Sequence, residues 1–151
     1  MVKKVIFVVI GFLLGMSLGF YFEAFFRGII QDVFKFSTSN KVQFNGKNIF
    51  IFSSRIFEYI LGFTLALFLL SNLNLKFEKV FKNVMLCLLI FGISVFVVSA
   101  INANLKVIEC TMCDDGILYL HWNNINFGFT IGLSAICSII PSVIRLIKKS
   151  K

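Results

Sequence analysis

The sequence predicts an all-α integral membrane protein: a four-helix transmembrane bundle, N-in/C-in, with two small outward-facing β-hairpins. Composition is the first reason, because 58% of the 151 residues are hydrophobic and the mean hydropathy is +0.92. Soluble domains average about 45–50% apolar residues. The second reason is that long uncharged runs occupy positions 5–22, 59–75, 83–105 and 116–144. The third is the distribution of basic residues, which separates the chain into two kinds of loop.

Each uncharged run is long enough for one transmembrane helix, since a span needs about 20 apolar residues. We expect a single membrane domain over 1–151, with outward loops 25–53 and 104–123 and a cytoplasmic loop 75–82. The predicted spans are 4–24, 54–74, 83–103 and 124–147. After "MVKK" the first run could instead be a cleaved signal peptide, but bulky aromatics in "GFYFEAFF" follow where a peptidase needs small residues, which favours a retained helix.

The net charge of +8 arises on one predicted side of the membrane. The N-terminus, the 75–82 loop and the C-terminal tail carry nine Lys or Arg residues and one Glu, whereas the other loops carry six of each sign. Cytoplasmic loops hold the excess of Lys and Arg. Both termini are therefore predicted to be cytoplasmic, in a bacterial inner membrane. The basic residues then orient the chain and contact anionic lipids, and we expect no nucleic acid binding.

The two outward segments contain signals for folded structure. In 26–35, Phe26, Ile30 and Val33 recur at helical spacing opposite Arg27 and Lys35, which predicts an interfacial helix or an extension of the first span. Asn45-Gly46 is a strong hairpin signal between "KVQF" and "NIFIF". A second hairpin is predicted from "LKVIECTM" and "ILYLHW". The two hairpins could form one cap sheet.

Small residues predict how the spans pack. Gly11, Gly15 and Gly19 follow one another at every fourth position in the first span, and Gly128 and Gly132 do so in the fourth. Such faces allow close approach of membrane helices. We expect the first span to pack against the fourth, with a homodimer through one of these faces as the alternative. Arg55 and Glu58 could pair at the outer end of the second span.

The segment "ECTMCDDG" holds the most distinctive residues of the outward loops. In an oxidising compartment Cys110 and Cys113 are predicted to form a structural disulfide. It would present a partner-binding loop, and the other members of this loop and of the first turn are Asp114, Asp115, Gly116, His121, Trp122, Asn45 and Gly46. A zinc site formed by Cys110, Cys113, Asp115 and His121 is an alternative. The prediction is no bound metal and no cofactor.

Two resemblances bear on function. "CTMC" and the four spans resemble membrane thiol oxidoreductases of the DsbB and VKOR type, which implies redox catalysis at Cys110 and Cys113. Those proteins use a second outward cysteine pair, and Cys87 and Cys137 fall inside predicted spans instead. In size, orientation and charge the layout resembles bacteriocin immunity proteins, superinfection-exclusion proteins and entry-exclusion proteins of conjugative plasmids.

We therefore expect a protective protein rather than an enzyme. Its helices and outward loops would bind an extracytoplasmic or intramembrane protein of a phage, a conjugation system or a toxin, and so block channel formation or DNA entry. An accessory subunit of a larger membrane complex is a third possibility. No ionisable side chain lies deep in a predicted span, which argues against a carrier or proton pump.

Overall fold

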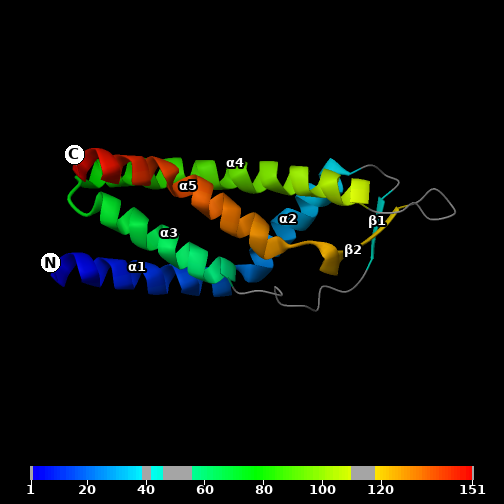
Figure 1. Cartoon of the computed structure of the whole chain (residues 1–151), viewed down its shortest axis with the longest axis horizontal. Coiled ribbons are helices and arrows are strands. Elements are labelled where there is room, and N and C mark those ends of the chain that lie inside the picture. The colour runs from blue at the N-terminus through cyan, green and yellow to red at the C-terminus, as the bar shows by residue number, and fades with distance from the viewer. Residues whose placement is uncertain (1, 39–41, 46–55, 110–117, 151) are drawn as a thin grey trace.

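The computed structural model describes residues 2–38, 42–45, 56–109 and 118–150, and helices dominate this part of the chain (Figure 1). The elements in chain order are α1 (Val2–Tyr21), α2 (Glu23–Ser37), β1 (Val42–Asn45), α3 (Ile56–Asn72), α4 (Phe77–Glu109), β2 (Leu118–His121), the 3₁₀ turn η1 (Trp122–Asn124) and α5 (Phe127–Ser150). The described residues thus form five α-helices and not the four of the expected bundle, because the outward amphipathic segment folds as a helix of its own.

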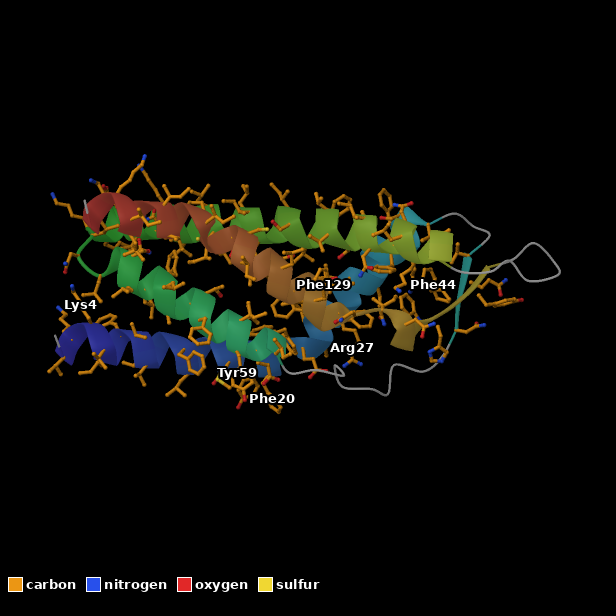
Figure 2. The ribbon with its side chains drawn as sticks, in the orientation of Figure 1. Lys4, Phe20, Arg27, Phe44, Tyr59 and Phe129 are labelled. Carbon is orange, nitrogen blue, oxygen red and sulfur yellow. The ribbon has the colours of Figure 1, made fainter. Side chains whose placement is uncertain are left out.

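The four long helices run lengthwise and place both chain termini at the same end (Figure 1). The turn between α3 and α4 lies at this end too, which we call the terminal end. The opposite end, here the cap end, carries α2 and the two strands (Figure 1). Lys4 lies near the terminal end, whereas Arg27 and Phe44 lie toward the cap end (Figure 2).

Three of the helices are long and apolar enough to cross a membrane: Val2–Tyr21, Phe77–Val107 and Phe127–Lys148. The apolar helix α3 is shorter, with 17 residues. Most of the large apolar side chains of α1 are exposed, and its buried positions are Gly11, Gly15 and Gly19. Exposed apolar surface on this scale is what a lipid environment covers, and it supports membrane association.

The glycine face of α1 packs against α3, so the expectation that the first span packs against the fourth was wrong. At Gly15, an added Cβ would overlap the Leu61 carbonyl oxygen and lie 2.7 Å from the Gly62 Cα. At Gly11 it would lie 2.8 Å from the Ala66 Cα. The two backbones approach closely only because each has small residues at the crossing. A homodimer could use this face only by displacing α3.

Helix α5 packs against both α3 and α4. A stripe of small hydroxyl residues on α5, Thr130, Ser134 and Ser142, is fully or almost fully buried. The hydroxyl of Ser134 donates to the Thr130 carbonyl at 2.7 Å, so its burial leaves no donor unsatisfied. Gly128 and Gly132 line a cavity of about 270 Å³ between α3 and α5.

The cap end contains one two-stranded sheet in which β1 and β2 run parallel, with Val42 opposite Leu118 and Asn45 opposite His121. Two hairpins are not confirmed: among the described residues each outward segment supplies one strand, and these strands pair with each other. The predicted first arm of the second hairpin is wrong from Leu105 to Glu109, because α4 continues through it. Just before this stretch, Ala103 of α4 is fully buried in the cap core.

Candidate binding face at the cap end

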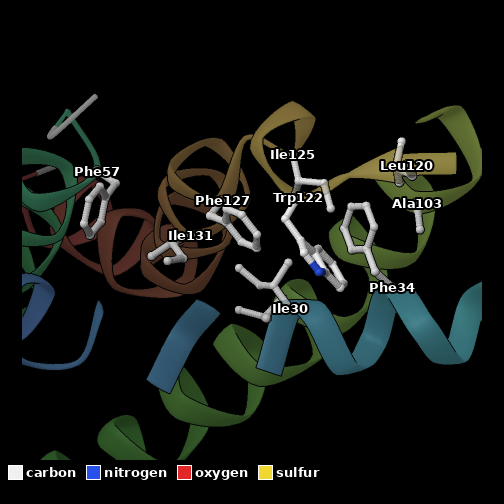
Figure 3. Packing of buried hydrophobic residues seen from close by; sticks show 10 residues of the cluster. Ile30, Phe34, Phe57, Ala103, Leu120, Trp122, Ile125, Phe127 and Ile131 are labelled. Atoms are coloured by element: carbon white, nitrogen blue, oxygen red, sulfur yellow. The ribbon is translucent and has the colours of Figure 1, made fainter. Parts of the chain in front are cut away.

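The cap end has a hydrophobic core assembled from segments far apart in the sequence. Ile30 and Phe34 of α2 are fully buried, and they meet Leu120 of β2 and Ile131 of α5 (Figure 3). The helix α2 itself begins after Phe22 and packs chiefly on α4 rather than α1. Its amphipathic pattern therefore has a protein partner, and the cap is a folded unit.

Trp122, directly after β2, holds the cap together from inside. Its side chain is 7% exposed, and its ring stacks on Phe44 of β1 with ring centroids 4.4 Å apart and planes 13° apart. The ammonium of Lys35 on α2 lies 5.9 Å from the centroid of the tryptophan ring, within range of a cation–π interaction. The tryptophan ring, which directly follows β2, thus contacts both α2 and β1.

Burial of Leu120 and Trp122 determines which side chains face outward, because neighbouring residues of a strand point to opposite faces. Tyr119 and His121 of β2 are exposed, and so are Gln43 and Asn45 of β1. The register sets Gln43 opposite Tyr119 and Asn45 opposite His121. We call these four residues the sheet face. It is a small surface of polar and aromatic groups on a rigid support.

The structure divides the sequence-predicted loop residues among three places. Asn45 and His121 lie together on the sheet face, whereas Trp122 lies beneath it in the core. The remaining members, Gly46, Cys110, Cys113, Asp114, Asp115 and Gly116, lie outside the described residues. The same holds for the turn predicted at Asn45-Gly46, for the disulfide, and for three of the four candidate zinc ligands.

Sequence reasoning missed Gln43 and Tyr119 as partners of Asn45 and His121 on one face. The alternation of apolar residues with Gln43, Asn45, Tyr119 and His121 in "VQFN" and "LYLH" could have indicated them, but only once the parallel pairing was known. Glu58 was expected at the outer end of the second span, paired with Arg55. Arg55 lies outside the described residues, and Glu58 is 6% exposed in the first turn of α3, against the Gly19 position of α1.

Sequence reasoning also missed a cluster of polar side chains at the terminal end. Asn72 ends α3, Asn83 lies in the second turn of α4, and Arg145 lies near the end of α5. The Asn83 amide donates to the Asn72 Oδ1 at 2.6 Å, and the Arg145 Nη2 donates to the Asn83 Oδ1 at 2.8 Å. This network connects three helices. Asn residues at the ends of apolar runs were its sequence signal.

Comparison with known proteins adds no relative: no protein-family model, no curated protein and no solved structure matches this chain.

Proposed function

We propose that this is a protective protein of the bacterial inner membrane that binds an incoming extracytoplasmic factor on its sheet face and blocks channel formation or DNA entry. The factor would be a phage, conjugation or toxin protein. The observation that carries the proposal is the cap: a helix, two strands and a buried tryptophan together display Gln43, Asn45, Tyr119 and His121. A surface held on packed elements in this way should lose less conformational entropy on binding than an unsupported loop.

The proposed orientation places the terminal end in the cytoplasm and the cap outside. Lys and Arg residues are concentrated on the segments that meet at the terminal end, which agrees with the positive-inside rule. In this arrangement α3 also crosses the membrane, in addition to α1, α4 and α5. Its 17 residues are at the lower limit for crossing the hydrocarbon core. The length of α4 also supports a sheet outside the bilayer. Helix α4 has 33 residues, about 50 Å, so it extends well beyond the roughly 30 Å core. Helix α2 packs along α4 at Phe91 and Phe96, so the sheet is the part of the cap placed beyond the core.

The chemistry of the sheet face suits protein recognition. Tyrosine is enriched among the residues that contribute most to interfaces, because it offers a large amphipathic surface with little conformational entropy. Tyr119 is 43% exposed and lies opposite the exposed Gln43, so we expect it to be the main contact on the sheet face. Loss of such a residue costs about 2 kcal/mol or more, which is roughly 30-fold in affinity.

A protection assay tests the proposal. Sensitive cells with and without the protein are challenged with a phage panel, with conjugal donors and with pore-forming bacteriocins. We expect protection against one of these classes. The absence of protection in all three, with the protein present in the membrane, would contradict the proposed function.

Two matched variants locate the binding surface. Tyr119→Ala removes an exposed tyrosine from the sheet face, whereas Tyr21→Ala removes one that is 80% exposed at the end of α1. We expect Tyr119→Ala to lose protection and Tyr21→Ala to keep it at equal membrane levels. Equal protection by both variants would exclude the sheet face as the binding surface.

A further inference from the structure

An apolar groove of about 420 Å³ lies among α1, α3 and α4, with α5 contributing Ser138 and Ile139. Its walls include Leu18 of α1, Leu61 and Phe68 of α3, and Leu88 of α4. The groove extends from the middle of α1 to Val84 near the start of α4. Its walls on α1, α3 and α4 therefore lie in the part of the protein that the proposed function places within the bilayer.

Aromatic rings form the groove wall toward the cap end. Phe22, Phe25 and Phe26 contact one another with centroid distances of 6.1–6.5 Å, and Phe26 makes an edge contact with Phe91 of α4 at 5.8 Å. All four line the groove. An occupant would thus meet a wall of rings at this end and would enter from the side or from the terminal end.

The terminal end of the groove leads to a half-buried cation. Cys87 lines the groove, and its thiol contacts the Ser138 carbonyl at 3.2 Å and the Ser142 hydroxyl at 4.0 Å. Asn83, one turn earlier on α4, binds Arg145, and Arg145 follows Ser142 by three residues on α5. On α5 the groove lining ends at Ile139, so Arg145 lies six residues beyond it, which is about 9 Å along the helix.

Arg145 donates hydrogen bonds to two neutral side chains, Asn72 and Asn83. Nη2 donates to the Asn83 Oδ1 at 2.8 Å and Nη1 to the Asn72 Oδ1 at 3.4 Å. Within the described ranges no carboxylate lies in a salt bridge with Arg145. Both amide oxygens hold the guanidinium in place without neutralising it. A guanidinium has five N–H donors, so it can still bind the oxygens of a phosphate.

We propose that the groove holds one acyl chain of an anionic phospholipid from the cytoplasmic leaflet, with the lipid phosphate at Arg145. Charge supports this occupant, because exposed Lys79, Lys82 and Lys148 surround the same end, where basic residues attract anionic headgroups. The groove is too small to enclose a transmembrane helix. A cylinder 10 Å wide with a 1.5 Å rise takes about 120 Å³ per residue, so a 20-residue span needs over about 2000 Å³. The lipid site depends on the proposed orientation but not on the sheet face.

Native mass spectrometry of the full chain in detergent tests headgroup recognition. The protein is titrated with phosphatidylglycerol or with phosphatidylcholine of the same acyl chains, and we expect one phosphatidylglycerol to be retained selectively. Arg145→Gln should weaken its binding about tenfold, because charge-assisted hydrogen bonds are lost. Arg145→Lys keeps the charge and should keep the selectivity. Lys148→Gln removes one exposed charge from the same helix and should change binding less than twofold.

Equal retention of the two lipids, or equal loss from Arg145→Gln and Lys148→Gln, would overturn the headgroup site. A retained peptide in place of lipid would also overturn it. A third outcome would support the lipid site but separate it from the proposed function. In this outcome phosphatidylglycerol is retained selectively through Arg145, and cells that carry Arg145→Gln are still protected.

A filled groove tests the position of the acyl chain. Leu65→Trp adds bulk in the groove lining, whereas Leu67→Trp adds it to an exposed position on the same helix. Leu65→Trp should abolish phosphatidylglycerol retention and Leu67→Trp should preserve it. If Leu65→Trp does not fold, alkylation of Cys87 in the unchanged chain tests whether the acyl chain occupies the groove. Protection of Cys87 by phosphatidylglycerol but not by phosphatidylcholine supports the groove, and equal alkylation with both lipids refutes it.

Discussion

Replacing Gly15 with alanine should separate α1 from α3. The added methyl group would overlap the Leu61 carbonyl oxygen, and it would lie 2.7 Å from the Gly62 Cα, where ordinary contact begins at 3.4 Å. Both obstacles are backbone atoms, so no side chain can rotate away. Inserting a methyl group into a tightly packed interface costs about 1–3 kcal/mol. The loss concerns the main contact of α1, because this helix packs chiefly on α3.

Gly92→Ala is the matched control. Gly92 lies inside α4 and nothing is within 4 Å of the position of its Cβ. Alanine there should stabilise the helix by about 0.5–1 kcal/mol, since glycine is the more flexible residue in the unfolded chain. Thermal unfolding in detergent, followed by the circular dichroism of the helices, should therefore give a lower Tm for Gly15→Ala and an unchanged or higher Tm for Gly92→Ala. A Tm for Gly15→Ala equal to or above that of the unchanged chain would refute the glycine packing of α1 on α3.

Three further changes address the cap. Trp122→Ala should destabilise it by about 3–5 kcal/mol, because the ring is buried against Phe44, and protease cleavage limited to the cap should rise in proportion. Asn126→Ala should lower the free energy of unfolding by about 1 kcal/mol, because the Asn126 Oδ1 accepts a hydrogen bond from the Phe129 N–H at 2.9 Å at the start of α5. An unchanged unfolding midpoint would contradict this capping role. Replacing Cys110 and Cys113 with serine should leave protection intact and cost at most about 2–3 kcal/mol, whereas complete loss of protection in a folded variant would favour the thiol oxidoreductase.

The helices could be predicted from local patterns, but their neighbours could not. The predicted span 54–74 corresponds to α3 at Ile56–Asn72, and 124–147 corresponds to α5 at Phe127–Ser150. The start of α5 moves to Phe127 because Asn126 caps it. Glycine spacing predicted a close helix contact, yet a stripe on one helix carries no information about its partner. Here the partner of the α1 glycines is the small pair Gly62 and Ala66 on α3.

The cap shows the same limit. The helical spacing of the apolar residues in 26–35 predicted an interfacial helix or an extension of the first span; α2 is a helix, and Ile30, Val33 and Phe34 on it are buried in the protein. The hairpin predicted at Asn45-Gly46 lies outside the described residues, and within them β1 pairs with a strand more than 70 residues later. Pairing at that separation leaves no local signal. The Asn residues at the ends of apolar runs were visible in the sequence, but nothing local indicated that Asn72, Asn83 and Arg145 meet on three helices.

The most direct test of the account is the location of the sheet face relative to the membrane. In a chain with its four cysteines replaced by serine, Asn45→Cys places one thiol on the sheet face and Lys148→Cys places one at the terminal end. Intact cells are treated with a membrane-impermeant maleimide, and lysed cells serve as the control. The account predicts labelling of Asn45→Cys in intact cells and of Lys148→Cys only after lysis. Labelling of Lys148→Cys in intact cells, with Asn45→Cys protected until lysis, would place the sheet face in the cytoplasm and contradict its role in binding an incoming factor.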